Sequence, residues 1–488
     1  MLWQPSQEFI KSSNLRHYFD WLEKNHNLRF DDYHAAWQWS VENVAGFWES
    51  LWQYFNVISH SPYSQVLSSE KMPGAKWFEG STLNYAEHVF RARNDSQPAL
   101  IFSSERQDLV EISWSELHDQ VASLATYLRE IGVKKGDRVA AYLPNFPEAT
   151  IAFLAAASIG AIWSSCSPDF GANSVIDRFA QIEPKVLFAV DGYTYGGKAF
   201  DKKQTVRELC EKLPSLDTLI VFPYLEENQD TGFWSGENFR QVRNVILKKD
   251  FIFFQDDISG AAEILFEAVP FDHPIYILFS SGTTGIPKAI THSHGGNLLE
   301  HLKYLHFHND VHPSERFFWF ATTGWMMWNF VQASLLAGAT AVLFDGSPGF
   351  PNLNRLWEFA EKAKITHFGT SAPFLVACMK EGLAPGKNFD LSHLRSIGST
   401  GSPLPPEAFD WVYKNVKKDL WLSSMAGGTD VCTAWVGGCP FEPVWEGEIQ
   451  CRCLGADIEA WNEAGDPVIG EVGELVVIKP MQSMPVFF

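Results

Sequence analysis

Several features that would point to common classes of protein are missing from this sequence. The longest apolar run, Ile151 to Trp163, is shorter than a membrane span and contains Ser158 and Gly160. The first residues lack a basic segment followed by an apolar one, so no secretory signal is visible. No G-x-S-x-G motif occurs, which argues against the serine nucleophile of an α/β-hydrolase. We therefore expect a soluble, cytoplasmic protein that works without such a nucleophile.

Cysteine is too sparse and scattered for a disulfide framework. The chain has seven cysteines among 488 residues, an odd number in a chain long enough to bury several cores. Cys451 and Cys453 form a C-x-C pair that would share one face of a strand, but no second Cys/His pair stands at zinc spacing. We expect the C-x-C pair to be structural and all seven cysteines to be reduced: Cys166, Cys210, Cys378, Cys432, Cys439, Cys451 and Cys453.

Positive charge is also in short supply. Lys and Arg number 38 against 58 Asp and Glu, which gives a formal net charge of −20. This balance argues against a nucleic-acid backbone or an anionic membrane as a partner. Apolar residues make up 46% of the chain and Trp occurs 19 times, which predicts a globular protein with large buried aromatic surfaces. Anionic small molecules would need a local group of hydrogen-bond donors.

Four regions differ in their residue pattern. Residues 1–92 are rich in Trp at helical spacing, and residues 433–488 read as short strands separated by glycine turns. Between them, apolar runs alternate with helical patterns in residues 93–270 and in residues 271–432, which predicts two α/β subdomains with mostly parallel sheets. Expected strands include residues 99–103, 137–142, 186–190 and 396–398, and expected helices include residues 113–131, 148–159 and 295–307.

The stretch from Tyr276 to Thr291 is the strongest functional signal. Tyr276 to Phe279 predict a buried strand that leads into a loop of Ser, Gly and Thr. Glycines let backbone amides converge on an anion, and hydroxyls and a lysine add donors and charge. The spacing differs from the Walker motif, because Ile286 and Pro287 precede the lysine. A plain surface loop is the alternative; the predicted phosphate-binding residues are Ser280, Ser281, Gly282, Thr283, Thr284, Gly285 and Lys288.

Two further polar loops follow predicted strands. In the segment Met425-Ala-Gly-Gly-Thr-Asp430, a hydroxyl beside a carboxylate suits a phosphate oxygen and its Mg²⁺, although plain turns have the same composition. The segment from Gly398 to Leu404 taken alone also fits an ordinary proline-terminated loop.

A fourth segment, residues 322–329, concentrates large side chains. Trp325, Met326, Met327 and Trp328 cannot all face a core from one irregular loop, so a pocket lining is expected, with ordinary core packing as the alternative.

These motifs resemble those of the adenylate-forming superfamily of acyl-CoA synthetases, acyl and aryl ligases and luciferases. Residues 276–291 match its phosphate loop, and residues 76–86, K-W-F-E-G-S-T-L-N-Y-A, resemble a segment of its acetyl-CoA synthetase branch. Residues 322–329, 338–348 and 427–430 are most similar to the acetoacetyl-CoA synthetase family. The resemblance covers essentially the whole chain and implies two stacked αβαβα subdomains, a small β-barrel subdomain and a mobile C-terminal α+β domain.

The resemblance also implies an AMP-forming acid–thiol ligase of lipid metabolism that uses ATP, Mg²⁺ and CoA. Acetoacetate would attack the α-phosphorus of ATP, and CoA would then displace AMP from the acyl-adenylate. Thr284, Thr429 and Asp430 would be catalytic, with Thr429 on a phosphate and Asp430 on Mg²⁺. The remaining implied contacts are Gly401, Ser402 and Pro403 for the nucleotide, Trp325, Met326, Met327, Thr400 and Gly427 for the acyl group, and Gly171, Gly196, Gly197 and Ala372 for CoA.

Four positions depart from the family pattern. Asp430 and Ser402 stand where glutamates are usual, and Tyr195 stands where an arginine contacts a CoA phosphate. Gly427 replaces the Trp that closes the pocket on a two-carbon acid in acetyl-CoA synthetases, which would leave room for a longer acid.

The resemblance implies further elements beyond Ile478: a T-G-D segment, an Arg hinge and the C-terminal domain with its catalytic Lys. None follows in this sequence, so we expect a truncated chain, with an incomplete β subdomain, that binds ATP and acid but turns over poorly. Three alternatives remain: a ligase for propionate, butyrate or 3-hydroxybutyrate, an adenylating domain for amino acids or carrier proteins, and a non-catalytic nucleotide-binding remnant. His292 and His294, just after the phosphate loop, are expected to be structural.

Overall fold

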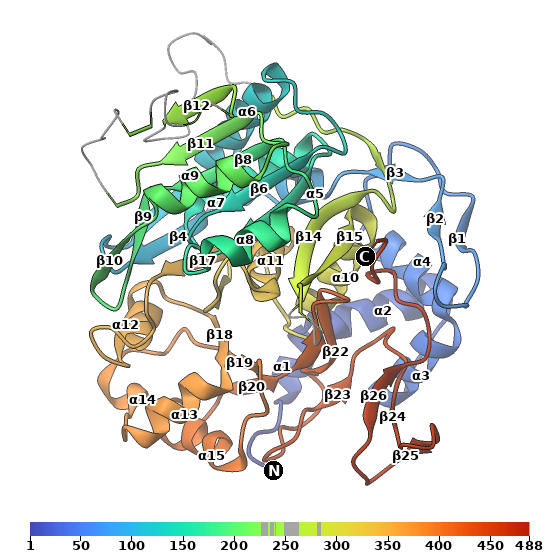
Figure 1. Cartoon of the computed structure of the whole chain (residues 1–488). Coiled ribbons are helices and arrows are strands. Elements are labelled where there is room, and N and C mark those ends of the chain that lie inside the picture. Colours follow the sequence, from blue (N-terminus) through green and yellow to red (C-terminus); the bar gives the residue numbers. More distant parts are fainter. Residues whose placement is uncertain (226–232, 235–238, 240, 248–262, 281–284, 488) are drawn as a thin grey trace.

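The computed structural model of this chain describes residues 1–225, 233–234, 239, 241–247, 263–280 and 285–487 (Figure 1). Ser281, Gly282, Thr283 and Thr284 of the predicted phosphate loop lie outside these residues. None of the helices in the described ranges combines the length and apolar character that crossing a membrane requires.

The first sheet has seven strands in the order β12-β11-β8-β6-β7-β14-β15. All neighbours are parallel except β14 and β15, which form an antiparallel hairpin. β8 is buried along its whole length, as expected for a parallel strand covered on both faces. The strands are β6 (Arg138–Tyr142), β7 (Ile162–Cys166), β8 (Val186–Val190), β11 (Thr218–Phe222), β12 (Asn244–Leu247), β14 (Pro274–Ser280) and β15 (Lys288–Ser293).

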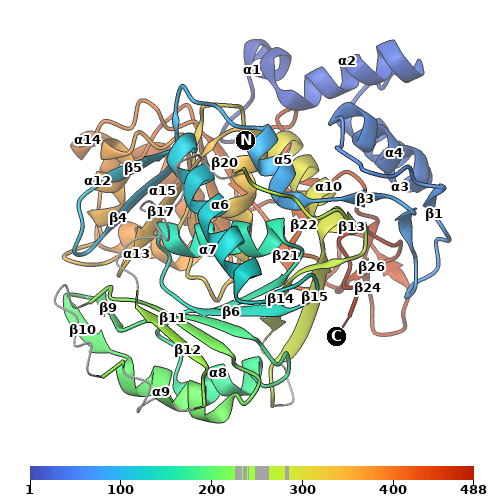
Figure 2. The same cartoon turned by 90° about the horizontal axis from the view of Figure 1, so that it is seen from above.

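Helices cover both faces of this sheet (Figure 2). One face carries two helices whose apolar residues share a hydrophobic cluster with β8 and β11. The other face carries two helices at the centre of the molecule. In that order they are α8 (Ala172–Phe179), α9 (Lys203–Lys212), α6 (Trp114–Glu130) and α7 (Pro147–Ser158).

The second sheet also has seven strands, in the order β20-β19-β18-β16-β17-β4-β5. It is parallel except for the edge pair β4 and β5. The strands are β4 (Pro98–Ser104), β5 (Val110–Ser113), β16 (Arg316–Trp319), β17 (Thr340–Asp345), β18 (His367–Ser371), β19 (Ser396–Thr400) and β20 (Trp421–Ser424).

The helices of the second sheet also lie in two layers. The inner layer joins the central core, and the outer layer packs on the far face. The inner elements are α10 (His294–Phe307), α11 (Met326–Ala333) and the short 3₁₀ helix η1 (Ser334–Ala337); the outer ones are α12 (Arg355–Lys362), α13 (Ala372–Lys380), α14 (Pro385–Asn388) and α15 (Pro406–Asn415). Two sheets with helices between and outside them confirm the predicted stacked α/β fold.

The two sheets are interleaved along the chain, which differs from the expected consecutive subdomains. β4 and β5 lie in the region 93–270 but join the second sheet beside β17. β14 and β15 lie in the region 271–432 but complete the first sheet beside β7. Alternation along the chain shows that strands are parallel, but it carries no information about which sheet each strand joins.

The N-terminal helices pack against the C-terminal strands on one side of the molecule (Figure 1). Trp3 pairs with Val444, and its indole Nε1 donates to Asp419 at 2.8 Å. The N-terminal elements are α1 (Gln7–Ser12), α2 (Asn14–His26), α3 (Tyr33–Glu42), α4 (Val44–Tyr54), β1 (Gln65–Leu67), β2 (Trp77–Glu79), β3 (Thr82–Leu83) and α5 (Tyr85–Arg91). Residues 1–92 are therefore largely helical, as their spacing predicts.

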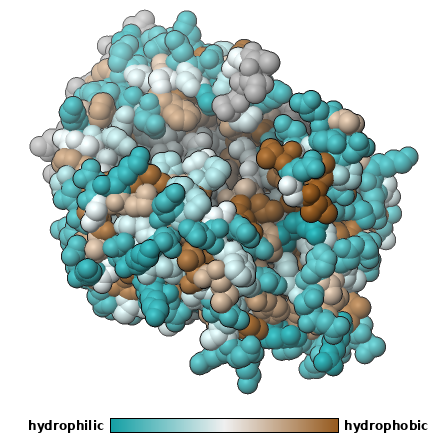
Figure 3. All heavy atoms as spheres, turned by 90° about the horizontal axis from the view of Figure 1, so that it is seen from below, coloured by the Kyte–Doolittle hydropathy of each residue, from teal (hydrophilic) through white to brown (hydrophobic). Residues whose placement is uncertain are grey.

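Short antiparallel strands form the C-terminal region. They are β21 (Ala426–Gly428), β22 (Thr433–Gly437), β23 (Cys451–Arg452), β24 (Ile458–Trp461), β25 (Pro467–Val468) and β26 (Glu474–Val477); β9 (Gly192–Tyr195), β10 (Lys198–Asp201) and β13 (Val269–Pro270) are short strands elsewhere. On the face in Figure 3 hydrophilic residues predominate and hydrophobic residues form small patches.

Candidate functional site

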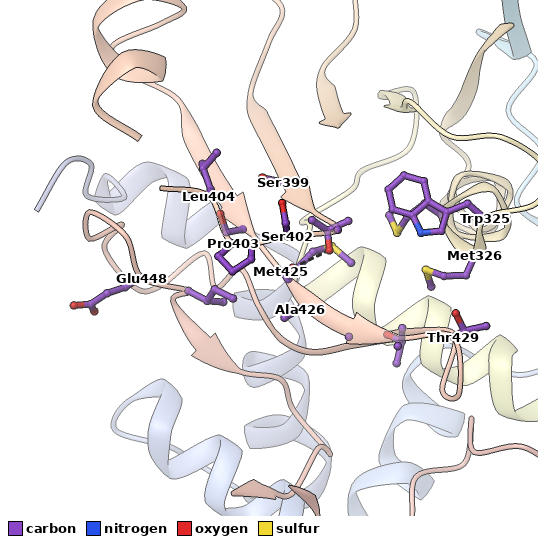
Figure 4. A pocket seen from close by; sticks show the side chains of 18 of the residues that line it. Trp325, Met326, Ser399, Ser402, Pro403, Leu404, Met425, Ala426, Thr429 and Glu448 are labelled. Carbon is purple, nitrogen blue, oxygen red and sulfur yellow. Dashed lines mark hydrogen bonds between the residues drawn. The ribbon is translucent and has the colours of Figure 1, made fainter. Parts of the chain in front are cut away.

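A cavity of about 430 Å³ opens beside the carboxyl ends of β19 and β20. The carboxyl ends of parallel strands are the usual ligand-binding edge of an α/β sheet. Residues from three predicted segments line the cavity together: Trp325, Met326 and Met327, then Thr400, Gly401, Ser402 and Pro403, then Gly427 and Thr429. Figure 4 shows Trp325 and Met326 across the cavity from Ser402 and Pro403. Three segments that lie far apart in the sequence therefore border one cavity.

The first wall is the start of helix α11. Trp325 is the N-cap residue, and Met326 and Met327 form the first turn. The Trp325 indole lies 3.9 Å from the position that a β-carbon would take at Gly401, so this wall reaches the opposite loop. Trp328 turns away and packs against Phe153 and Trp163. Helix formation explains the division, because successive side chains point about 100° apart around the axis.

The second wall is the loop after β19. Gly401 has φ +86, a left-handed conformation that favours glycine. Before it, the Thr400 hydroxyl donates to the Met425 carbonyl at 2.9 Å, which holds the loop against the strand end of β20. Two predicted segments are thus joined by a hydrogen bond that sequence spacing could not reveal.

The third wall contains Gly427, which the sequence predicts to leave room for a longer acid. In the structure, a close approach of backbone requires the glycine. A β-carbon at Gly427 would lie 2.0 Å from the Thr433 carbonyl oxygen and 2.4 Å from the α-carbon of Ala434. Strand β22 therefore passes directly over Gly427, and only a glycine fits that approach. Backbone bounds the cavity at this point. A glycine in place of the tryptophan of acetyl-CoA synthetases therefore does not enlarge the cavity by the full volume of an indole.

The described ends of the predicted phosphate loop form a hairpin. Ser280 ends β14 opposite Lys288 at the start of β15. Gly285 has φ +128, and the Lys288 side chain is exposed. The predicted contacts from Ser281, Gly282, Thr283 and Thr284 lie outside the described residues.

His292 connects this hairpin to the Thr429 segment. Its Nε2 donates to the Thr429 carbonyl at 2.8 Å. Burial lowers the pKa of His292 to about 4, so the imidazole is neutral near pH 7. The sequence predicts a structural histidine at this position. In the structure the buried ring is hydrogen-bonded to the backbone of Thr429, a predicted catalytic residue that lies far from it in the sequence.

Asp430 follows Thr429 but does not line the cavity. Its side chain is exposed, and the described part of the chain contains no group of three His, Cys, Asp or Glu residues that could hold a metal. One carboxylate with a neighbouring hydroxyl fits Mg²⁺ when substrate phosphates supply further oxygen ligands.

The four predicted CoA residues lie outside the cavity lining. Gly171 is the N-cap residue of α8, and Ala372 begins α13. The Phe170 ring lies 3.0 Å from the β-carbon position at Gly324, beside the Trp325 wall. Gly171 is therefore close to the cavity through its neighbour.

Gly196 and Gly197 lie in the β9–β10 turn, where Glu105 occupies their amides. The Glu105 carboxylate accepts from Gly196 N at 2.8 Å, from Gly197 N at 2.7 Å and from Ser347 N at 2.6 Å. Glu105 also lines a separate cavity of about 390 Å³ with Arg106, Arg355 and Lys362. The backbone amides of these two glycines are thus already hydrogen-bonded to a carboxylate of the chain itself.

Helix α8 links the CoA segment to the phosphate hairpin. The Arg178 guanidinium lies 5.0 Å from the Phe170 ring centroid and 5.8 Å from that of Phe279. Gln181 Nε2 donates to the Pro287 carbonyl at 3.0 Å. A positive charge therefore lies beside the hairpin, at a position that no motif in the sequence indicates.

A row of hydroxyls across three neighbouring strands was not predicted from the sequence. Thr370, Ser399 and Ser424 are in register on β18, β19 and β20, and their oxygens are buried without a protein partner among the described residues. Ser399 and Ser424 line the cavity. Buried polar groups normally have partners, so these oxygens are suited to a ligand or water.

Two protein-family models match most of the chain. Residues 87–487 match the model of the AMP-binding enzyme family, and residues 33–89 match the acetyl-coenzyme A synthetase N-terminus. The chain is 43% identical over 488 residues to acetoacetyl-coenzyme A synthetase of Rhizobium meliloti (strain 1021), covering 100% of this chain and 73% of that protein. It is 39% identical over 491 residues to acetoacetyl-CoA synthetase of Gallus gallus, covering 100% of this chain and 72% of that protein.

A solved structure is similar over the same span. The structure of acetoacetyl-CoA synthetase from Streptomyces lividans superposes with a TM-score of 0.92 at 46% sequence identity. The similarity covers 99% of this chain and 73% of that one.

Proposed function

Because the chain belongs to the AMP-binding enzymes, and among them to the acetoacetyl-CoA synthetase family, we propose that it activates acetoacetate with ATP and transfers the acyl group to CoA. The acid carboxylate attacks the α-phosphorus, giving acetoacetyl-adenylate and pyrophosphate. The CoA thiol then attacks the acyl carbon and releases AMP. The shared cavity supports this proposal, because it joins the predicted acyl wall to the predicted nucleotide loop.

In this proposal the cavity orients the two reacting groups. Trp325, Met326 and Met327 enclose the short acyl chain, and residues 400–403 with Gly427 border the acid and the nucleotide. The carboxylate is then held in line with the α-phosphate, and positioning of this kind supplies much of the acceleration in phosphoryl chemistry. No protein nucleophile is required.

The charge that develops on the phosphates is met by donors on two segments. Thr429 and the loop residues Ser280 to Lys288, including Thr284, contact the phosphates, while His292 holds the Thr429 backbone in place. Asp430 would hold Mg²⁺ together with ATP oxygens, and the ion would neutralise phosphate charge. Donors aimed at developing charge stabilise the transition state more than the ground state.

CoA would approach from the side of Phe170, where Gly171 opens helix α8 beside the acyl wall. Ala372 and the Gly196–Gly197 turn complete the proposed CoA contacts. Because Glu105 already occupies the two turn amides, a CoA phosphate there would rely on Arg106, Arg355 and Lys362 in the adjoining cavity. We also propose a cytoplasmic location, where ATP and CoA are available and seven free cysteines stay reduced.

Calorimetry with a panel of acids tests the proposal. We expect ATP binding to the protein to tighten more with acetoacetate than with acetate, propionate, butyrate or 3-hydroxybutyrate, and ATP–pyrophosphate exchange to follow the same order. Met326→Trp places a larger side chain in the acyl part of the cavity. It should remove the effect of the acid on ATP binding, while ATP should still bind in the absence of acid. Absence of ATP binding, or an equal effect of all the acids, would refute the assignment.

A further inference from the structure

The Glu105 side chain connects separate parts of the fold. Glu105 follows β4 of the second sheet, and Ser347 lies in the loop after β17 of the same sheet. Gly196 and Gly197 form the turn between β9 and β10, which comes after β8 of the first sheet. Figures 1 and 2 both show this hairpin beside helix α12. The amides of these three residues donate to Glu105 over distances between 2.6 and 2.8 Å, so backbone donors from both sheets converge on one carboxylate.

Glycine residues make this convergence possible. Gly196 and Gly197 are the two-residue turn of the hairpin, with φ +61 and +74, a left-handed conformation that favours glycine. A β-carbon at Gly346 would lie 2.6 Å from Cγ of Glu105, so a larger residue there would displace the carboxylate. Successive backbone amides in turns of this kind form concavities that bind anions. The Glu105 carboxylate therefore lies in an anion-binding site made of backbone.

A carboxylate has only two oxygens for the three donors at this site. Oε1 of Glu105 accepts from both Gly196 and Ser347, while Oε2 accepts from Gly197. A phosphate monoester has three terminal oxygens and nearly two negative charges, so it offers one oxygen to each amide. Glu105 is half-buried and Gly197 is exposed, so a solute can reach the amides from solvent. A phosphate therefore suits these donors at least as well as the carboxylate does.

The charges around the site favour replacement of Glu105 over addition of a second anion. Asp345 is a close neighbour, because its carbonyl accepts from Glu105 N at 3.3 Å. Burial, together with the nearby charge of Glu105, raises the pKa of Asp345 to about 7. A phosphate beside both carboxylates would add like charge to a half-buried place. A displaced Glu105 side chain can instead turn into the adjoining cavity that it already lines, next to Arg106, Arg355 and Lys362.

We propose that Glu105 competes with a phosphate monoester for the amides of Gly196, Gly197 and Ser347. The ligand, which rests on the proposed function, is the 3′-phosphate of CoA. Because Glu105 is tethered beside the amides, its effective concentration there is high and a free phosphate must displace it. While Glu105 holds the amides, the phosphate depends on the cations of the adjoining cavity. Glu105 is thus a specificity-determining residue that limits how much the 3′-phosphate contributes to CoA affinity.

Hydrogen–deuterium exchange of the β9–β10 hairpin, followed by mass spectrometry with and without inorganic phosphate, tests the competition. In the unchanged protein the amides are bonded to Glu105, so phosphate should not alter their exchange. Glu105→Ala should speed exchange in buffer, and phosphate should then slow it. Glu105→Gln keeps a carbonyl oxygen as acceptor and should change exchange in the same direction to a smaller extent. Asp108→Asn is the matched control, because Asp108 is exposed and its change removes one negative charge from the same cavity. It should behave as the unchanged protein does.

Three results would overturn the competition. Phosphate may slow exchange equally in the unchanged protein and in Glu105→Ala, which would show that Glu105 does not block the amides. Phosphate may leave exchange in Glu105→Ala unaltered, which would show that the amides do not bind it. Asp108→Asn may match Glu105→Ala, in which case loss of any negative charge suffices. If Glu105→Ala does not fold, the same comparison with Glu105→Gln decides, and an absence of any phosphate effect in that variant overturns the proposal.

Calorimetry with CoA and with dephospho-CoA, which lacks only the 3′-phosphate, tests the ligand. The preference for CoA, measured as the ratio of the two Kd values, should rise roughly tenfold in Glu105→Ala, as expected for a gained hydrogen bond to a charged group. The affinity for dephospho-CoA should stay the same. If inorganic phosphate slows exchange in Glu105→Ala but the ratio is unchanged, the anion site stands and CoA is overturned as its ligand. A failure of the proposed ligase function alone would leave the phosphate result as expected.

Discussion

Removing one charge from the Glu300–Lys303 pair on α10 should destabilise the protein far more than removing both. The two side chains are completely buried, and Lys303 Nζ lies 2.8 Å from Glu300 Oε1. Glu300 also accepts from Thr433 at 2.8 Å and from Gln482 at 3.0 Å. Lys303 also donates to the Leu454 carbonyl at 2.8 Å. Each charge therefore has neutral partners in addition to its ionic one.

The expected sizes follow from this environment. Lys303→Met leaves a buried carboxylate with neutral donors only, and Glu300→Gln leaves a buried ammonium with a carbonyl. Breaking a buried pair in this way costs about 3–5 kcal/mol of unfolding free energy. The double variant removes both charges while Gln retains an acceptor for Thr433, so we expect a loss of only about 1–2 kcal/mol. The coupling free energy between the two sites should thus be at least ~4 kcal/mol.

Urea unfolding monitored by tryptophan fluorescence measures this cycle. Glu358 and Lys362 provide the matched control, because their charged atoms are also 2.8 Å apart but the side chains are 40% and 54% exposed. Glu358→Gln and Lys362→Met should each change stability by less than about 1 kcal/mol and show little coupling. If the α10 variants are additive to within ~0.5 kcal/mol, as distant sites are, the buried pair does not act as one unit.

Three further predictions follow from the same contacts. Burial lowers the pKa values of His292, His301 and His306 to about 4 from 6.5, so the unfolded chain binds more protons between those values and stability falls as pH drops below 6.5. Each histidine contributes up to about 1.4 kcal/mol per pH unit, measurable as the urea midpoint at pH 7 and pH 5.5; an unchanged midpoint would contradict the shifts. Gly427→Ala should abolish ATP binding in calorimetry, because its β-carbon would meet the β22 backbone, while Gly171→Ala, whose β-carbon would have no atom within 4 Å, should leave ATP binding unchanged; equal effects on ATP binding would refute this contrast. Met326→Ala should raise kcat/KM for a six-carbon 3-oxo acid relative to acetoacetate by roughly 10-fold or more, and an unchanged ratio would remove Met326 from the acyl wall.

The sequence predicted the regular elements closely because each depends on local pattern. The expected helix at residues 113–131 is α6 (Trp114–Glu130), and the expected strand at residues 186–190 is β8 (Val186–Val190). Sheet membership could not be predicted in the same way. β4 pairs with β17 across more than two hundred residues, and that pairing depends on how the layers pack rather than on the strand itself.

The site was predictable to the extent that its chemistry is local. Motifs at strand ends identified the cavity walls because parallel strands bring such ends to one edge. The contacts that position those motifs join distant parts of the chain: His292 with Thr429, and Thr400 with Met425. Nothing in the spacing of these residues indicates that they meet.

Helix α10 shows why a local pattern can also mislead. Its charged and histidine residues would normally mark a solvated face, yet Glu300, His301 and Lys303 are completely buried. The helix begins directly after β15, and its polar groups reach Thr433 in β22, Cys432 just before that strand and Leu454 just after β23. α10 therefore carries polar contacts from the phosphate hairpin to the strand that covers Gly427. A change in this buried network should alter ATP binding even where no altered residue touches the cavity, which separates its role from simple core packing.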